Sequence, residues 1–345
     1  MLLGVLCGLG AAILQSLSYI ASRHFTHSRG GGAGWALVVL VHLWLGLMAA
    51  VTLPMVWTTG VPWHLVIWPL VGSAVCVFSG QWGLTLAIRL AEPSRVSPLL
   101  TMKVFLPAIL TTIFGPPVGQ VAERYLTPWQ WAAVVMCVIA GVSINRGGGG
   151  MRKKALAAII GCSIVFGCSD WCVGMAIGGL LKTPGISPLR ASLLGESILF
   201  LMTAAGGISL LLAGAGVPAG RKIFAWPDWR DSFPYAATWF TAMICLFIAF
   251  GKIGIVLATI LQCTRSFITI LIGAGLMLLG LEHIEPRQPA RVILIRIAAG
   301  VLMSVAISLY ILRDPVAFFR HAQNPNPAPT HLPTSSLLSL TQDRQ

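Results

Sequence analysis

The chain has 345 residues, of which 56% are hydrophobic and only 10% are charged, against about 25% charged in a typical soluble domain. Its 23 Lys and Arg and 10 Asp and Glu are too few to coat a water-facing globule, which excludes an ordinary soluble protein. A net charge of +13 would suggest nucleic-acid binding in a soluble protein, but here the cations lie mostly between apolar runs, so we expect no nucleic-acid partner. The composition predicts an all-α integral membrane protein.

Apolar runs bounded by Gly, Pro and charged residues predict ten transmembrane helices along the chain. The predicted helices cover residues 2–22, 34–57, 65–88, 96–115, 127–145, 154–179, 187–214, 233–250, 253–280 and 291–312. In the fourth, Pro98 and Pro107 bracket Lys103. Because proline removes a backbone donor and bends a helix, we expect this helix to be either a kinked gate or a static bend.

The spacing of the ten helices divides the chain into two halves. Residues 1–145 form a first five-helix repeat, 146–153 form a linker of glycines and basic residues, and 154–313 form a second five-helix repeat. Residues 314–345 are rich in Pro, Ser and Thr and lack the apolar surface to fold alone, which predicts a disordered tail.

The two halves share a sparse pattern. Glu123 is followed by Gly141 eighteen residues later, and Glu282 is followed by Gly300 at the same spacing. A similar offset aligns the fourth predicted helix with the ninth, and each of these carries one cation. Because each half has an odd number of spans, a duplication would place the second half upside down relative to the first, as in many transporters.

The end of each half also resembles a known family pattern. Residues 123–130, with the sequence ERYLTPWQ, and the following helix up to Gly141 resemble the end of a repeat in EamA-like proteins of the drug/metabolite transporter superfamily. The second half matches more loosely, with either Glu282 or Glu285 as the acidic residue and Gly300 at the end. The resemblance implies a basket of ten helices with two inverted repeats and a central cavity that moves small organic solutes.

Charged residues inside the membrane are functional candidates because burying a charge in hydrocarbon costs roughly 2.5 to 3.5 kcal/mol or more. Lys103 and Arg265 lie on the repeat-related fourth and ninth predicted helices, and Asp170 and Glu196 lie inside the sixth and seventh. The cations are predicted to bind an anionic group of the substrate, such as a carboxylate or phosphate. The alternatives are that they pair internally with Asp170 and Glu196, or that Lys103 snorkels to an interface. The two carboxylates could also exchange protons and couple transport to a proton gradient.

Polar and aromatic residues at helical depth complete the predicted substrate site, since a binding cavity needs a few convergent polar groups on an apolar wall. Besides Lys103, Arg265 and Asp170, the candidates are Gln15, Tyr19, Gln81, Trp82, Trp171, Trp239, Gln262 and Thr264. Each has a structural alternative: Trp and Tyr are common anchors at the membrane interface, and buried Gln or Thr can bond across helices.

These features favour a secondary transporter that works by alternating access in the plasma (inner) membrane, as a monomer or homodimer. Its expected partner is a small organic solute, with an anionic metabolite as one candidate. A lipid-linked sugar flippase or a channel of the same fold is the alternative. An intramembrane enzyme is less expected because only His42 among the histidines lies inside a span and no H-E-x-x-H or G-x-S-x-G motif occurs. The eight cysteines lie in apolar stretches, and no His stands beside Cys168 and Cys172, so we expect no metal or other cofactor.

Two arguments about orientation disagree. Most of the Lys and Arg between the predicted helices fall in the odd-numbered connections, so the positive-inside rule places both termini outside. The family resemblance implies both termini inside. The charge pattern is the stronger argument because Arg152, Lys153 and Lys154 stand together beside the linker.

Overall fold

A computed structural model describes residues 2–29, 33–91, 93–115, 126–144, 152–212, 225–278 and 289–312. Within these ranges the chain is helical and contains no strand. The helices are α1 (Leu2–Arg29), α2 (Ala33–Val56), α3 (Trp63–Leu90), α4 (Pro93–Leu99), the 3₁₀ helix η1 (Leu100–Val104), α5 (Phe105–Phe114), α6 (Pro128–Ile144), α7 (Lys153–Leu180), α8 (Pro188–Leu212), α9 (Trp226–Ile253), α10 (Ile255–Cys263), α11 (Arg265–Leu278) and α12 (Ala290–Leu312). The glycine run of the predicted linker, the predicted tail, Glu123 and Glu282 lie outside the described residues.

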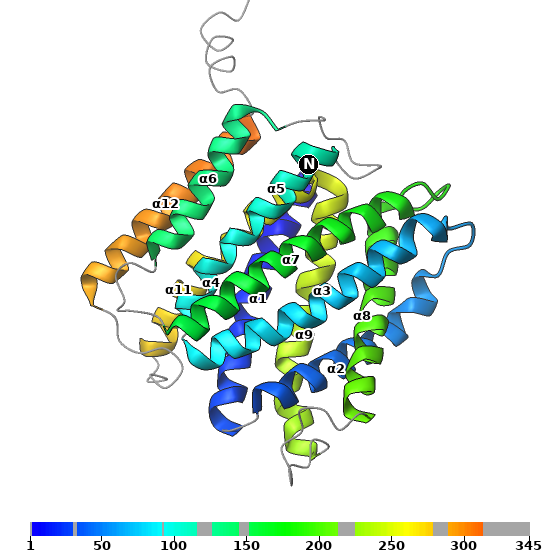
Figure 1. Cartoon of the computed structure of the whole chain (residues 1–345), viewed down its shortest axis with the longest axis horizontal. Helices are drawn as coiled ribbons and strands as arrows, with labels where there is room; N and C mark the ends of the chain where they lie inside the picture. The colour runs from blue at the N-terminus through cyan, green and yellow to red at the C-terminus, as the bar shows by residue number, and fades with distance from the viewer. Residues whose placement is uncertain are drawn as a thin grey trace, which may run out of the picture.

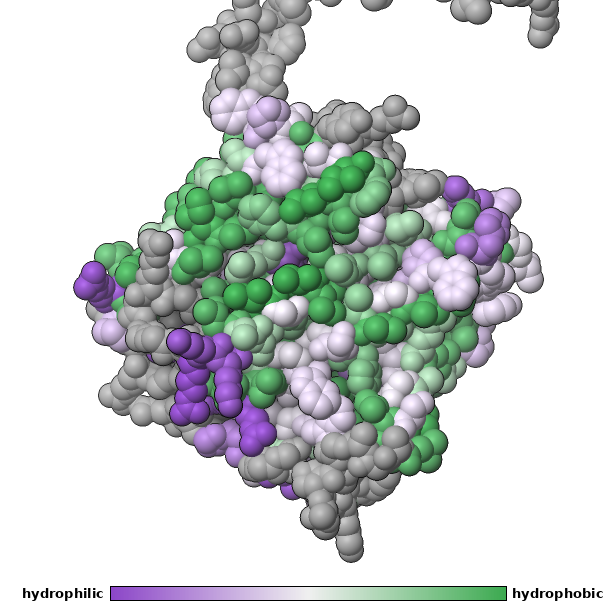
Figure 2. Space-filling model, viewed as in Figure 1, coloured by the Kyte–Doolittle hydropathy of each residue, from purple (hydrophilic) through white to green (hydrophobic). Residues whose placement is uncertain are grey.

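Eight segments of the described chain are long and apolar enough to cross a membrane. They comprise α1, α2, α3, α7, α8 and α9, together with the segments Arg95–Phe114 and Ile255–Leu276, each of which combines consecutive helices. The fifth and tenth predicted spans correspond to shorter apolar stretches, Pro128–Ser143 and Ile297–Leu312. Figure 2 shows apolar residues across the middle of one face and hydrophilic residues at its rims. These features indicate a multi-pass membrane protein.

The helices of the two predicted halves pack pairwise against each other (Figure 1). The main pairs are α1 with α9, α2 with α8, α3 with α7 and α6 with α12. The last pair lies along one edge of the bundle. Close approach rests on small residues: Gly80 lies against the ring of Phe166 between α3 and α7, and Gly46 lies against Ala204 between α2 and α8.

The fourth helix of each predicted half is interrupted. In the first, α4 gives way to η1 and then to α5, and in the second, α10 ends at Cys263 before α11 begins at Arg265. Pro107 explains the first interruption, because it lacks the N–H that would bond the carbonyl of Lys103 in a regular helix. The predicted bend at the prolines is therefore present as a 3₁₀ segment, whereas the second helix, predicted as continuous over 253–280, is interrupted without a proline.

The two glycines of the sequence pattern pack against these interrupted helices. A Cβ added at Gly141 of α6 would clash with the side chain of Thr101 and the carbonyl oxygen of Pro98. A Cβ added at Gly300 of α12 would approach the ring of Phe267 to 2.7 Å. Each glycine thus lets the last helix of its half lie directly on the fourth helix of the same half.

Candidate functional site

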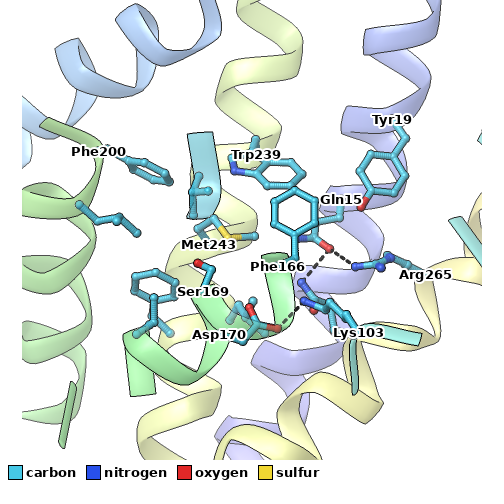
Figure 3. Close-up of a pocket in the computed structure, with 16 residues that line it drawn as sticks. Gln15, Tyr19, Lys103, Phe166, Ser169, Asp170, Phe200, Trp239, Met243 and Arg265 are labelled. Carbon is cyan, nitrogen blue, oxygen red and sulfur yellow. Dashed lines mark hydrogen bonds and ion pairs between the residues drawn. The ribbon is translucent and has the colours of Figure 1, made fainter. Parts of the chain in front are cut away.

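A cavity lies in the middle of the bundle, where helices of both predicted halves converge (Figure 3). Its lining residues are Gln15, Tyr19, Val77, Lys103, Phe166, Ser169, Asp170, Val173, Leu199, Phe200, Trp239, Met243, Leu246, Phe247, Gln262 and Arg265. The cavity volume is about 20 Å³, which leaves room for about one water molecule. In this structure the walls of the cavity close around the polar groups. An organic solute can therefore bind there only if the surrounding helices move apart.

The 3₁₀ segment brings Lys103 to Asp170. Gly167 of α7 faces the carbonyl oxygen of Lys103, and a Cβ there would come within 2.9 Å of that oxygen, so only a glycine allows η1 to lie so close. Asp170 stands one turn further along α7, on the same face. The Nζ atom of Lys103 lies 2.6 Å from Oδ2 of Asp170, and the lysine is only 4% exposed. The pair is therefore a buried salt bridge.

Arg265 enters the cavity at the second helix interruption. Its Nη1 donates a hydrogen bond of 3.0 Å to Oε1 of Gln15, and Nε2 of Gln262 donates to the same oxygen at 2.8 Å. The guanidinium carbon lies 5.7 Å from the ring centroid of Tyr19, which is a cation–π contact. The hydroxyl of Ser16 lies 3.1 Å from the backbone carbonyl oxygen of Arg265, which places the start of α11 against α1.

The cavity lining carries more positive than negative charge. Lys103 and Arg265 face it with a single carboxylate, that of Asp170. Among the described residues, the buried Nε of Arg265, the indole Nε1 of Trp239 and the acceptor Oε1 of Gln262 have no hydrogen-bond partner. The surplus positive charge, together with two free donors, makes the site chemically suited to an anionic group.

The structure brings seven of the predicted substrate residues to this cavity. They are Gln15, Tyr19, Lys103, Asp170, Trp239, Gln262 and Arg265. This placement supports one of the predicted internal pairs, Lys103 with Asp170, whereas Arg265 bonds the neutral Gln15 instead of a carboxylate. The assignment of these residues to substrate binding stays a prediction.

Four predicted residues lie outside the cavity lining. Gln81 accepts a hydrogen bond of 2.6 Å from the hydroxyl of Tyr235, which ties α3 to α9 behind Trp239. Trp82 is 47% exposed on the outer face of α3. Trp171 packs against the hydrophobic core, and the hydroxyl of Thr264 donates to the carbonyl of Leu261 at 2.7 Å.

Glu196 lies on α8, one turn from the cavity residue Phe200. It is 1% exposed, and within the described part of the chain neither carboxylate oxygen has a hydrogen-bond partner. Of the predicted internal set of two cations and two carboxylates, Glu196 is therefore not paired there. Its predicted role in proton coupling stays a prediction.

Sequence reasoning missed most of the apolar wall of the cavity. Phe166, Phe200, Met243 and Phe247 line it, and Ser169 adds a hydroxyl that bonds Ser73 of α3 at 2.8 Å. A stretch that is apolar on every side gives no signal for which face points inward. For Ser169, its position next to Asp170 in the sequence is the signal that could have indicated a place in the cavity.

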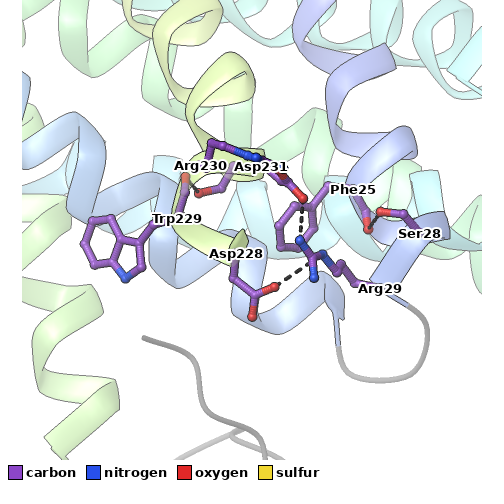
Figure 4. A network of polar contacts seen from close by, with 8 residues as sticks. Phe25, Ser28, Arg29, Asp228, Trp229, Arg230 and Asp231 are labelled. Carbon is purple, nitrogen blue, oxygen red and sulfur yellow. Dashed lines mark hydrogen bonds and ion pairs between the residues drawn. The ribbon is translucent and has the colours of Figure 1, made fainter. Parts of the chain in front are cut away.

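A polar network closes one end of the α1–α9 pair (Figure 4). Arg29, the last residue of α1, forms ion pairs with Asp228 at 3.3 Å and with Asp231, both in the first two turns of α9. Trp44 of α2 packs its ring edge-on against Trp229, and its Nε1 donates to the carbonyl of Trp229 at 3.2 Å. The network therefore joins the two predicted halves at this end of the bundle.

Comparison with known proteins shows the fold and nothing finer. No family model and no curated protein matches the chain. Among 28 matching chains of solved structures, one described only as "Crystal structure of protein" shares a TM-score of 0.60 and 16% identity. The match covers 93% of this chain and 98% of that one. The class that the structure defines is thus an all-helical, multi-pass membrane protein with a buried, positively charged cavity.

Proposed function

We propose that the protein is a secondary transporter of small organic anions. The observation that carries the proposal is the central cavity, in which Lys103 and Arg265 face one carboxylate and two buried donors lack partners. The surrounding aromatic rings of Tyr19, Phe166 and Trp239 suit an organic body attached to the anionic group. The substrate class is therefore a small carboxylate, sulfonate or phosphate with an apolar portion.

The arrangement of the helices supports two inverted five-helix repeats. Exchange of the halves turns the α1–α9 pair into the α7–α3 pair, and it leaves the α2–α8 and α6–α12 pairs unchanged. The helices α1 and α7 both have 28 residues, as do α3 and α9. A twofold axis that relates the two halves requires this exchange of helix partners. In addition to the eight long segments, we count α6 and α12 as the ninth and tenth membrane spans.

The two cations occupy equivalent positions in this scheme. Lys103 stands ten residues after Pro93, the first residue of α4, and Arg265 stands ten residues after Ile255, the first residue of α10. Both fall at the interruption of the fourth helix of their half. Interrupted helices near the midplane are the usual location of substrate sites in transporters with inverted repeats, which supports a shared binding role for this pair.

The closed cavity favours a carrier over an open channel. A volume of about 20 Å³ between the walls admits little more than a water molecule, so conduction through this conformation is blocked. Transport then requires the halves to move, and the ion pairs of Arg29 at one end of α1 and α9 are the contacts that must break there. We assign this arrangement to alternating access.

The transport proposal is tested with three solutes that share one ring and differ in permanent charge. The purified protein is reconstituted into vesicles, and counterflow of labelled benzenesulfonate, benzenesulfonamide and phenyltrimethylammonium is measured. We expect saturable, protein-dependent counterflow of the anion alone, because the cavity has surplus positive charge. Preference for the ammonium ion, or the absence of flux and of ligand-induced thermal stabilisation for every anion in a wider panel of carboxylates and phosphates, would contradict the proposal.

Weakening the Arg29 network is expected to open that end of the protein. In a cysteine-free background, Ser22→Cys places a thiol at a fully buried position of α1 between Tyr19 and Arg29. Partly exposed ion pairs contribute about 0.2 to 1 kcal/mol each, so Arg29→Gln is expected to raise the rate of maleimide labelling about fivefold. The matched control is Arg230→Gln, whose side chain is 70% exposed and forms an ion pair with Asp231 at 3.1 Å but none with α1 in the described structure. Equal labelling in both variants would show that the network does not hold this end closed.

A further inference from the structure

A second pocket lies on the outer face of the bundle, between the first turns of α2 and the last turns of α3. It is lined by Gly34, Trp35, Val38, Trp82, Thr85, Leu86 and Arg89, and its volume is about 120 Å³. It is therefore several times roomier than the central cavity. Trp82, which the sequence predicts in the substrate site, lies in this groove instead.

The groove is open because a glycine lies at its bottom. Gly34 leaves a gap between the two helices, and a Cβ there would meet only the methyl group of Thr85, at 3.1 Å. The rings of Trp35 and Trp82 meet edge to face with centroids 3.8 Å apart and form one wall. Trp82 and Leu86 are 47% and 39% exposed, so this wall faces outward, where the bilayer surrounds the protein.

The polar end of the groove is positively charged. Arg89 is exposed in the last turn of α3, seven residues and about 10 Å along the helix from Trp82. Of the described residues that line the groove, none is acidic. The groove thus has an arginine at the end of the span and an aromatic slot that extends toward the apolar middle of the membrane.

More basic residues lie at the same level of the bundle. Gly83 of α3 lies against Ala158 and Cys162 of α7, so in this antiparallel pair the end of α3 at Leu90 is level with the start of α7. Arg152, Lys153 and Lys154 are exposed there. Figure 2 shows strongly hydrophilic residues gathered at one corner of this face, beside the apolar area.

We propose that this groove binds one anionic phospholipid, with its phosphate on Arg89 and part of an acyl chain between Trp35 and Trp82. A guanidinium group binds phosphate through paired hydrogen bonds, and Trp rings are favoured at the level of lipid headgroups. The basic residues at the start of α7 add attraction for negative headgroups, about fivefold in affinity for each cation near the surface. By the positive-inside rule this is the cytoplasmic leaflet, where anionic lipids are available.

The proposal is tested by native mass spectrometry of the full-length protein with dioleoyl phosphatidylglycerol or dioleoyl phosphatidylcholine. We expect one tightly bound phosphatidylglycerol and preference over phosphatidylcholine. Arg89→Gln should weaken phosphatidylglycerol binding about fivefold, and Trp82→Ala should weaken both lipids. The matched controls are Lys182→Gln, at the other end of the bundle, and Trp68→Ala, an exposed tryptophan near the other end of α3. Melting temperatures near that of the wild type confirm that the variants are folded.

A photoactivatable phosphatidylglycerol locates the lipid. Crosslinks are expected on peptides that contain residues 34–38 and 82–89, and Trp82→Ala should remove them. Unchanged phosphatidylglycerol binding in Arg89→Gln, or crosslinks that map elsewhere, would overturn the proposal. A dimer that Trp82→Ala dissociates, with lipid binding unaffected, would instead assign the groove to a second copy of the chain. These readouts do not depend on transport, so the lipid site and the proposed function fail separately.

Discussion

Replacement of Arg265 by glutamine is expected to lower anion affinity and counterflow about 100-fold. The guanidinium group is 2% exposed, donates to Gln15 through Nη1 and keeps Nε without a partner in the cavity. A hydrogen bond to a charged group contributes about 1.5 to 3 kcal/mol, and 2.8 kcal/mol corresponds to a factor of about 100. Binding is measured as anion-induced thermal stabilisation, and transport as counterflow of benzenesulfonate.

Two further variants separate a binding role of Arg265 from a structural one. Arg265→Lys keeps the charge but loses the planar fork, so it should retain part of the anion binding. Lys252→Gln removes an exposed cation at the end of α9, outside the cavity, and should leave both readouts unchanged. If Arg265→Gln folds, melts near the wild-type temperature and still binds anions normally, the cavity is not the anion site.

The charged part of the site could be predicted from the sequence because intramembrane charges are rare. Lys103, Asp170 and Arg265 stand out in an apolar chain, and all three meet at one cavity. Depth along a helix follows from counting residues, but direction around the helix does not. Gln81 and Trp82 have the same depth as the cavity residue Val77 to within about a turn, yet they face Tyr235 and the outer surface. A helix that is apolar on all sides carries no periodic pattern that would reveal this.

The fold shows the same division between what a sequence contains and what only packing determines. Each of the ten predicted apolar ranges is helical in the described structure, because Gly, Pro and charged residues mark where apolar runs stop. Pro98 and Pro107 indicated the bend beside Lys103. The interruption before Arg265 has no such marker in the sequence, because no proline lies in α10 or in the first turns of α11.

The buried pair of Lys103 and Asp170 is expected to dominate stability when only one partner is removed. Loss of one member of a buried salt bridge costs about 3 to 5 kcal/mol, because the other charge stays buried without compensation. Asp170→Asn leaves Lys103 and Arg265 without a carboxylate in the cavity and should be the more damaging change. Lys103→Met leaves Asp170 with Arg265 in the same cavity and should fall at the lower end of that range.

The double variant Lys103→Met/Asp170→Asn completes the cycle, measured as free energy of unfolding in mixed micelles. It is expected to be more stable than Asp170→Asn alone, since no unpaired carboxylate or lysine remains. Asp231→Asn, which breaks a partly exposed pair with Arg29, serves as the control and should cost less than about 1 kcal/mol. Additive losses in the double variant would show that the two residues are not coupled.

The same variants connect stability with anion binding. In Asp170→Asn the two cations of the cavity have no carboxylate, so an added anion takes the place of the missing charge. Benzenesulfonate should therefore raise the melting temperature of Asp170→Asn more than that of the wild type or of the double variant, because the cavity has a formal charge of +2 in Asp170→Asn and +1 in the other two. At a fixed concentration a ligand stabilises the state that it binds more as its affinity rises, so this order follows from the charge of each cavity. The reverse order would mean that the anion does not enter the cavity between Lys103 and Arg265.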